Sequence, residues 1–67
     1  MIEIELNGAP HSVPAQHTLH ELIEALQLVG QALALAVNRS VVPRQRWAAH
    51  VINQHDKVDI VRAIGGG

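Results

Sequence analysis

The sequence contains no cysteine, no tyrosine and no phenylalanine, and its only aromatic residue is Trp47. A chain without cysteine forms no disulfide and offers neither a thiolate nucleophile nor a cysteine-based zinc site, which is typical of intracellular proteins. Any sulfur chemistry must therefore use a group other than a cysteine side chain. A single tryptophan also gives no stacking platform for single-stranded nucleic acid.

Excess charge and long apolar runs are lacking too. The five Lys and Arg residues are scattered and the formal net charge is −1, so no basic stripe is available for a nucleic-acid backbone. No apolar run approaches the ~18–20 residues of a membrane span. The start, Met1-Ile2-Glu3-Ile4-Glu5, lacks the basic region of a signal peptide. We therefore expect a cytoplasmic protein with no nucleic-acid or membrane partner.

The first residues predict a β-hairpin. Apolar residues alternate with glutamate over residues 2–6, the period of a strand with one dry and one wet face. Asn7-Gly8 favours a tight hairpin turn. Residues 9–13 then return as a short edge strand, because Pro10 and Pro14 cannot donate to a ladder.

A helix is predicted next. Thr18 is followed three residues later by Glu21, the spacing of a capping box. Apolar residues at spacings of three and four then form one stripe that can cover a sheet. Gly30 stands where a left-handed residue would end the helix.

The second half predicts further strands. Large residues alternate with Ala34 and Ala36 over 33–37, so one face of that strand carries small side chains that a partner could cover; simple tolerance of alanine is the alternative. The remaining elements are an extended pair at 41–42, a helical turn at 43–47 that opens on proline, a short strand at 50–52 and a last strand at 58–63.

The predicted order is β-β-α-β-β-β with short connections. The helix can then cross one face of a mixed sheet of four to five strands, with the first and last strands parallel and central. This is an α+β architecture of the β-grasp, ubiquitin-like type. At 67 residues the chain fits one small domain. We assign residues 1–64 to it and residues 65–67 to a flexible tail.

Side chains suited to catalysis or metal binding are sparse. Five histidines are the main candidates, and His17 and His20 straddle the helix start, but a metal needs a third or fourth ligand. We therefore expect no metal site and solvated histidines. The carboxylate pairs Glu3 with Glu5 and Glu21 with Glu24 fall on outward faces, where such pairs usually only solvate. Trp47 is expected to anchor the core rather than bind a ligand.

The closing run Ile64-Gly65-Gly66-Gly67 is the remaining candidate. Three residues without Cβ extend to about 10 Å and can thread a narrow channel, although a poorly ordered end is the alternative. No helix follows to make a phosphate cradle. The terminal carboxylate, with a reference pKa of about 3.3–3.7, is ionised and a poor electrophile. If it attacks the α-phosphate of ATP in a partner's site, the acyl-adenylate formed can be opened by sulfur to a thiocarboxylate.

Three segments resemble a known family. They are Thr18-Leu19-His20-Glu21-Leu22, the run from Ala36 to Trp47 with its Val-Pro-Arg, and the closing Gly66-Gly67. Together they are similar to the ThiS family, the sulfur carriers of bacterial thiamine biosynthesis, over essentially the whole chain. The middle segment is the specific part, since a terminal Gly-Gly is shared by every ubiquitin-like carrier.

The resemblance implies a β-grasp carrier that is not itself an enzyme. An E1-like adenylating enzyme of the ThiF type would adenylate Gly67 with Mg-ATP, so the chain itself would bind no cofactor. Sulfur would come from cysteine through a desulfurase, and the thiocarboxylate would deliver it to a thiazole synthase of the ThiG type. The partner's active site would receive Ile64, Gly65, Gly66 and Gly67. We expect Ala34, Ala36, Val61 and Ala63 to form the docking surface for both partner enzymes.

Three alternatives remain open at this point. The small subunit of molybdopterin synthase uses the same fold and tail, a ubiquitin-like modifier would form isopeptide bonds, and a plain interaction module would have an inert tail. The fate of the terminus separates them: a thiocarboxylate for a carrier, an amide for a modifier and an unchanged acid for a module.

Overall fold

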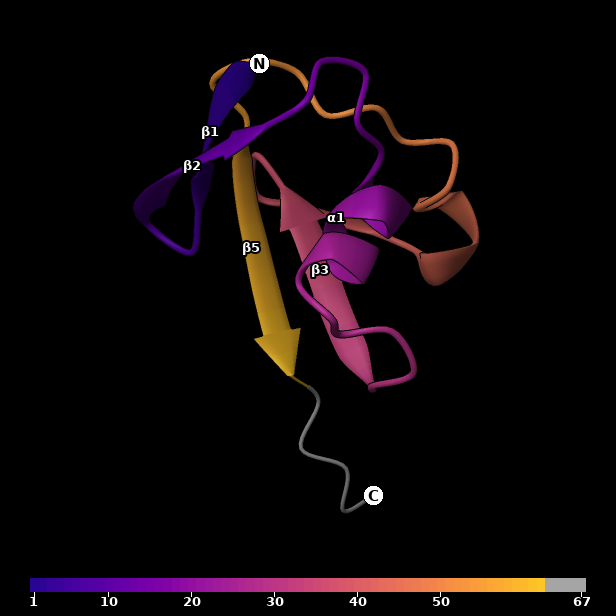
Figure 1. The fold of residues 1–67 in the computed structure, drawn as a ribbon. Coiled ribbons are helices and arrows are strands. Elements are labelled where there is room, and N and C mark those ends of the chain that lie inside the picture. The colour runs from indigo at the N-terminus through magenta and orange to yellow at the C-terminus, as the bar shows by residue number, and fades with distance from the viewer. Residues whose placement is uncertain (63–67) are drawn as a thin grey trace.

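The computed structural model describes residues 1–62, which form one mixed sheet and one α-helix (Figure 1). The strands run in the order β2-β1-β5-β3-β4 across the sheet. Their bounds are β1 Ile2–Leu6, β2 Ala9–Val13, β3 Leu33–Val37, β4 Ser40–Val42 and β5 Lys57–Arg62. The helix α1 spans Leu19–Ala25, and a 3₁₀ turn, η1, spans Arg44–Arg46. The element order confirms the β-grasp prediction.

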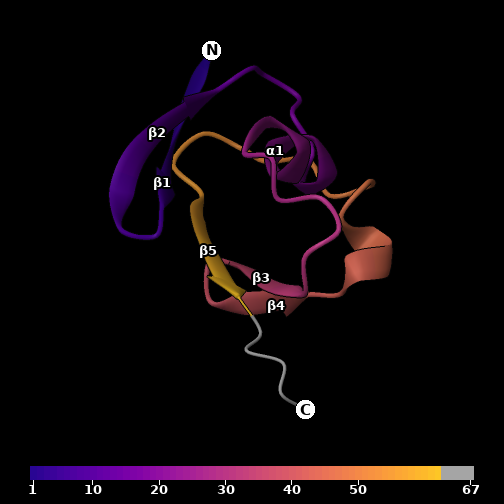
Figure 2. The same ribbon diagram turned by 60° about the horizontal axis from the view of Figure 1, so that its bottom comes forward.

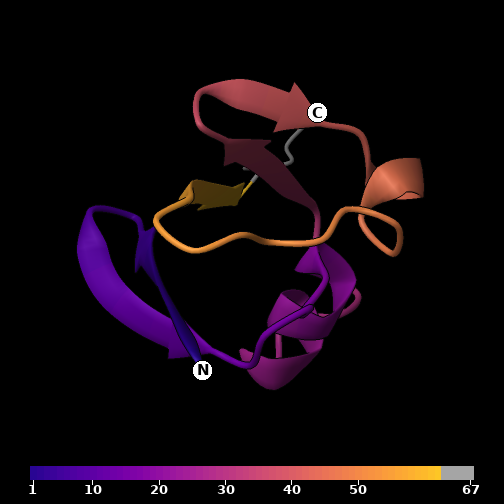
Figure 3. The same cartoon turned by 90° about the horizontal axis from the view of Figure 1, so that it is seen from above.

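β5 is the middle strand of the sheet. It pairs parallel with β1 and antiparallel with β3, which confirms that the first and last strands are parallel neighbours. The sheet curves around α1, as Figure 3 shows. The hairpin of β1 and β2 lies at one end of this curve and the pair β3 and β4 at the other (Figure 2).

Both hairpins of the sheet turn through two residues with positive φ. Asn7 and Gly8 have φ of 50° and 84°, and Asn38 and Arg39 have φ of 51° and 71°. Positive φ at both central residues is the type I′ turn, whose twist matches that of the strands. Each asparagine also contacts β5: Asn7 Oδ1 accepts from the Ile60 N–H at 2.8 Å, and Asn38 Oδ1 accepts from the Lys57 N–H at 3.0 Å. The two turns therefore hold the middle strand from both sides.

The helix begins with the predicted capping box. Thr18 Oγ1 accepts from the Glu21 N–H at 3.2 Å, and Glu21 Oε1 accepts from the Thr18 N–H at 2.9 Å. Two backbone donors that the helix start leaves free are thus satisfied. The same hydrogen bonds hold the pKa of the Glu21 carboxyl below its usual value.

We expect acid to weaken this cap. Folding lowers the pKa of the Glu21 carboxyl. The carboxylate therefore stabilises the fold at pH values above its pKa in the unfolded chain, and this stabilisation is lost as the pH falls through its pKa in the folded chain. The unfolding temperature of the wild type should therefore fall between pH 7 and pH 3, and it should fall less steeply in Glu21→Gln. Glu24→Gln, one turn further on, is the matched control; equal slopes in wild type and Glu21→Gln would contradict the role of the cap.

The helix ends earlier than the sequence predicted. Its last residue is Ala25, and Gln27 rather than Gly30 takes the left-handed position, with φ of 61°. The Leu28 N–H donates to the Ile23 carbonyl and the Gln27 N–H to the Glu24 carbonyl, both at 3.0 Å. These two bonds make a complete Schellman cap. The prediction was wrong because it assigned the cap to the nearest glycine; Gly30, with φ of 88°, bends the loop that follows.

Gln27→Gly should therefore stabilise the protein. A residue with a Cβ costs roughly 1–2 kcal/mol in the left-handed region, and glycine removes this cost. Part of the gain is offset because glycine gives the unfolded chain more conformational freedom. The expected net gain is about 0.5–1 kcal/mol in the free energy of unfolding by urea. Gln27→Ala keeps the Cβ and should bring no gain; equal effects of the two substitutions would show that backbone strain is not the cause.

The core lies between α1 and the concave side of the sheet. Leu19, Leu22 and Ile23 of the helix are buried against the strands, and Trp47 is only 5% exposed. The Trp47 indole N–H donates to the Val42 carbonyl at 2.8 Å. This confirms the predicted anchoring role, since a buried indole needs an acceptor.

The short strand predicted at residues 50–52 is not present as a strand. Val51 makes one isolated antiparallel bridge, to Thr18, flanked by bonds from the Leu19 N–H to the His50 carbonyl and from the Ile52 N–H to the His17 carbonyl. The ladder stops there because its partner segment enters the helix at the next residue. Ser40–Val42 supplies the remaining strand. No helix among residues 1–62 is long and apolar enough to cross a membrane.

Candidate functional site

The candidate site begins where β5 ends. Arg62 is the last described residue and pairs in register with Leu33. The predicted tail Ile64, Gly65, Gly66 and Gly67, the docking residue Ala63 and the boundary between residues 64 and 65 lie outside the described residues. What the structure places is the strand that leads to them and the surface beside it.

That surface is the outer face of β3, β4 and β5. Val61 lies directly opposite Ala34 in the register of β5 with β3, and Ala36 lies opposite Asp59. Val61 is 61% exposed, Ala34 is exposed and Ala36 is half-buried. The structure thus brings three of the four predicted docking residues together on one convex face.

Val41 belongs to the same face and was missed from the sequence. It lies opposite Ala36 in the register of β4 with β3 and is 76% exposed. The signal was present, because neighbouring residues of a strand point to opposite faces and Val42 is buried. Ala34, Ala36, Val41 and Val61, which we call the apolar face, lie on three neighbouring strands, with the exposed Asp59 beside Ala36.

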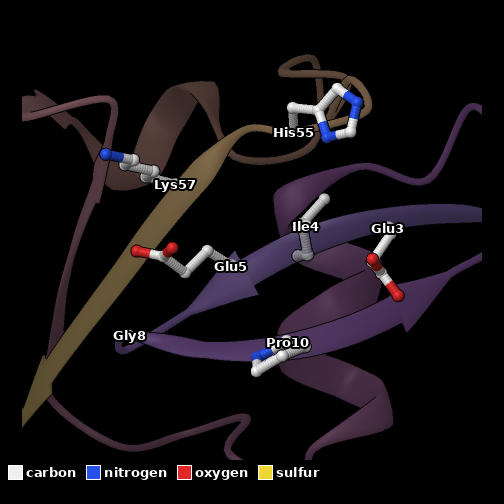
Figure 4. A pocket seen from close by; sticks show the side chains of 7 residues that line it. All are labelled: Glu3, Ile4, Glu5, Gly8, Pro10, His55 and Lys57. Carbon is white, nitrogen blue, oxygen red and sulfur yellow. The ribbon is translucent and has the colours of Figure 1, made fainter.

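The outer face carries charged side chains over β1 and the first part of β5. There a shallow hollow of about 310 Å³ is lined by the outward side chains of Glu3, Glu5, His55 and Lys57, with Pro10 and Gly8 at its edge (Figure 4). Within residues 1–62, no three His, Asp or Glu side chains gather closely enough to hold a metal ion. The hollow is charged, and it shares no lining residue with the apolar face.

A second hollow, of about 140 Å³, lies on the helix side of the molecule. Trp47 lines it together with Arg44, whose guanidinium stands 5.1 Å from the centre of the indole ring and donates to the Gln31 carbonyl at 2.9 Å. A cation over an indole is a stabilising contact, and each side chain also donates to a backbone carbonyl, Arg44 to Gln31 and Trp47 to Val42. This hollow is therefore explained by packing around η1.

The two histidines at the helix start do not form a shared site. His17 Nδ1 lies 3.9 Å from Glu21 Oε1, and His20 Nε2 lies 3.8 Å from Glu24 Oε2. Each histidine thus faces a carboxylate one helical turn ahead of it rather than the other histidine. Such pairs on an exposed helix contribute little to stability, because solvent screens them.

No catalytic constellation is present among the described residues. Within residues 1–62 the buried set contains no polar or charged residue, and every buried side-chain nitrogen or oxygen atom has a hydrogen-bond partner. Buried, unpaired or strongly perturbed polar groups are the usual marks of a catalytic site. The described residues show neither a buried polar residue nor an unpaired buried side-chain atom.

Comparisons with known proteins agree with this arrangement. The model of the ThiS family matches residues 3–67. The chain is 35% identical to the sulfur carrier protein ThiS of Escherichia coli over 66 residues, which are 98% of this chain and 100% of that protein. The crystal structure of the thiamine biosynthesis protein ThiS from Geobacter metallireducens superposes with a TM-score of 0.82 at 25% identity, covering 98% of this chain and 100% of that one.

A further relative is much longer than this chain. A thiazole synthase of Magnetococcus marinus is 36% identical over 66 residues, which are 98% of this chain but only 20% of that protein. A stretch similar to this chain is therefore joined to a larger remainder in that polypeptide.

Proposed function

The chain belongs to the ThiS family of sulfur carriers in thiamine biosynthesis, and on that premise we propose that the carboxylate of Gly67 is the group that carries the sulfur. An E1-like adenylating enzyme activates this carboxylate with Mg-ATP. The resulting thiocarboxylate gives its sulfur to thiazole synthase. The chain itself is a cosubstrate of these enzymes and holds no cofactor.

The chemistry follows from the nature of a carboxylate. At neutral pH the group is an anion and resists nucleophiles, so one oxygen must first become a good leaving group. Attack of the Gly67 carboxylate on the α-phosphate of ATP releases pyrophosphate and forms an acyl-adenylate. A persulfide formed by a cysteine desulfurase then displaces AMP to give an acyl disulfide. A thiol of the sulfur-donating protein attacks the outer sulfur of that acyl disulfide, which releases the thiocarboxylate and leaves a disulfide on the donor.

The proposal is supported by two facts taken together: the chain is similar over its full length to a sulfur carrier, and its sequence contains no cysteine. A carrier without a thiol side chain must hold sulfur elsewhere, and the terminal carboxylate can do so after activation. The chain supports this use because β5 ends at Arg62, and only two residues separate it from the closing glycines. The proposal also locates the chain in the cytoplasm, where ATP is available.

Thiazole synthase is the partner for which the comparisons give support. Two thiazole synthases, from Magnetococcus marinus and Paramagnetospirillum magneticum, each contain a stretch similar to 98% of this chain. Joining in one polypeptide is a common arrangement for units that work together. The adenylating enzyme and the desulfurase are proposed from the chemistry alone.

We assign docking of both enzymes to the apolar face, with Ala63 as its continuation along the chain. Its small and β-branched side chains let a partner's backbone approach closely, and exposed apolar patches often mark interaction sites. The same tail must enter two different active sites, so one shared docking surface beside it suits both partners.

Growth without thiamine tests the function. The chain should restore it to a bacterial strain that lacks its own thiamine sulfur carrier, to the level given by that strain's native gene. The same cells with added thiamine control for toxicity. If growth depends on added thiamine while the chain is expressed and folded, the assigned pathway is wrong.

A further inference from the structure

The last four of the six residues of β5 have a neighbouring strand on one side only. β3 accompanies it from Val58 to Arg62, whereas β1 pairs with it only through Lys57 and Val58. Figure 1 shows β1 and β2 turning back while β5 continues beyond them. Within residues 1–62, no strand lies beside the last part of β5 on its β1 side.

The hydrogen bonds identify which backbone groups face this open side. The Asp56 and Val58 carbonyls accept from the Glu5 and Asn7 N–H groups, both at 2.9 Å, so even-numbered residues of β5 point toward β1. The Lys57 carbonyl accepts from the Asn38 N–H at 2.7 Å, so odd-numbered residues point toward β3. Since a strand alternates, the Ile60 carbonyl and the Arg62 N–H face the open side.

Asn7 marks the end of the occupied part of this edge. Its Oδ1 accepts from the Ile60 N–H at 2.8 Å, in the place where the backbone of β1 would have accepted had it continued. Beyond this side chain the edge is free among the described residues. An unpaired strand edge is a template for another chain.

We propose that an extended strand of the adenylating enzyme pairs with β5 at Ile60 to Arg62, bonding to the Ile60 carbonyl and the Arg62 N–H. This inference rests on the proposed function and deepens it, because it names how the partner recognises the chain next to the tail. Addition of a strand to an open edge recognises main-chain groups. It would fix the direction in which the chain leaves β5.

The position of the edge favours an enzyme that receives the tail, and in the proposed sequence of steps the adenylating enzyme is the first to do so. The open groups lie on the strand that leads to Gly67, seven and five residues before it, so a protein that receives the tail passes close to this edge. The edge also borders the apolar face through Val61, whose side chain points outward between the two open residues. A single partner can therefore cover both surfaces.

Arg62→Pro and Arg62→Ala test the pairing together. Both remove the exposed side chain, but only proline removes the N–H, and position 62 does not donate to β3. Proline is tolerated at such edge positions. We expect Arg62→Pro to bind the adenylating enzyme about tenfold more weakly than Arg62→Ala, from loss of one hydrogen bond that leaves a carbonyl unpaired. Equal dissociation constants would overturn the proposal.

Hydrogen exchange gives a second readout on the unaltered chain. The Arg62 amide should exchange quickly in the free protein and slowly in the complex, whereas the Val61 amide, which faces β3, should be protected in both. Unchanged exchange at Arg62 on binding would overturn the pairing, even if Arg62→Pro failed to fold. Protection of Arg62 in a dimer of the chain alone would assign the edge to a second copy instead.

One further experiment separates strand pairing at β5 from sulfur transport by Gly67. Wild-type chain from the same preparation is incubated with the adenylating enzyme, ATP and a sulfur source, and its terminus is examined. A thiocarboxylate together with equal binding of the two Arg62 variants rejects the edge and leaves the carrier function intact. An unchanged acid rejects the carrier function.

Discussion

Deletion of Gly67 should abolish sulfur transfer while leaving the fold intact. The shortened chain still ends on a glycine carboxylate, but that carboxylate lies about 3.3–3.6 Å short of its former position along an extended chain. A misplacement of about 1 Å at a reacting centre can cost about 100-fold in rate. We therefore expect at least that loss in thiocarboxylate formation, measured by mass spectrometry with the adenylating enzyme.

Two controls separate reach from chemistry in this experiment. A chain extended by one alanine after Gly67 displaces the carboxylate by the same distance in the other direction and should lose activity to a similar degree. Thermal unfolding should be unchanged in both variants, because the buried core lies between Ile4 and Val58. Normal sulfur transfer by the shortened chain would contradict the assignment of Gly67.

Val61→Lys should disrupt docking of both partner enzymes. Val61 is the β5 residue of the apolar face, beside Ala34 and close to the strand end. A lysine there brings a charge that must lose water when a partner covers it. Losses at a residue that the partner fully covers reach about 2 kcal/mol or more, which is roughly 30-fold in the dissociation constant. Binding to the adenylating enzyme and to thiazole synthase, by calorimetry, measures the effect.

Val29→Lys is the matched control for this substitution. Val29 is 60% exposed and Val61 is 61% exposed, so each variant places the same charge at a site of the same exposure. Val29 lies on the helix side, by the hollow that Trp47 lines. It should bind both enzymes normally, and both variants should unfold at the wild-type temperature. Equal weakening by Val29→Lys and Val61→Lys would remove the docking role from the apolar face.

Local patterns predicted most of the fold. The alternation at residues 2–6, the Asn7-Gly8 turn and the capping box from Thr18 to Glu21 each rest on interactions within a few residues, and each is present. The errors have tertiary causes. Gln27 takes the left-handed cap at a cost that the packing of Leu28 against the core offsets, and Val51 stays a single bridge because its partner segment becomes helix.

In the candidate site, too, some residues could be predicted from local patterns and others depend on tertiary structure. Ala34, Ala36 and Val61 could be predicted because each lies in a strand whose alternation is clear, whereas Val41 required the register of β4 with β3. The open edge beside Arg62 could not be predicted either. Nothing in the local sequence shows that β1 stops pairing after Leu6 while β5 continues to Arg62.

The mass of the intact chain after incubation with an adenylating enzyme, ATP and a sulfur source tests the central claim most directly. We expect one terminal oxygen to be exchanged for sulfur, with the change in mass confined to the C-terminal fragment that contains Gly67. A chain that keeps its original mass, in a reaction where the enzyme converts a known sulfur carrier, would contradict it. Added sulfur on any residue other than Gly67 would contradict it too.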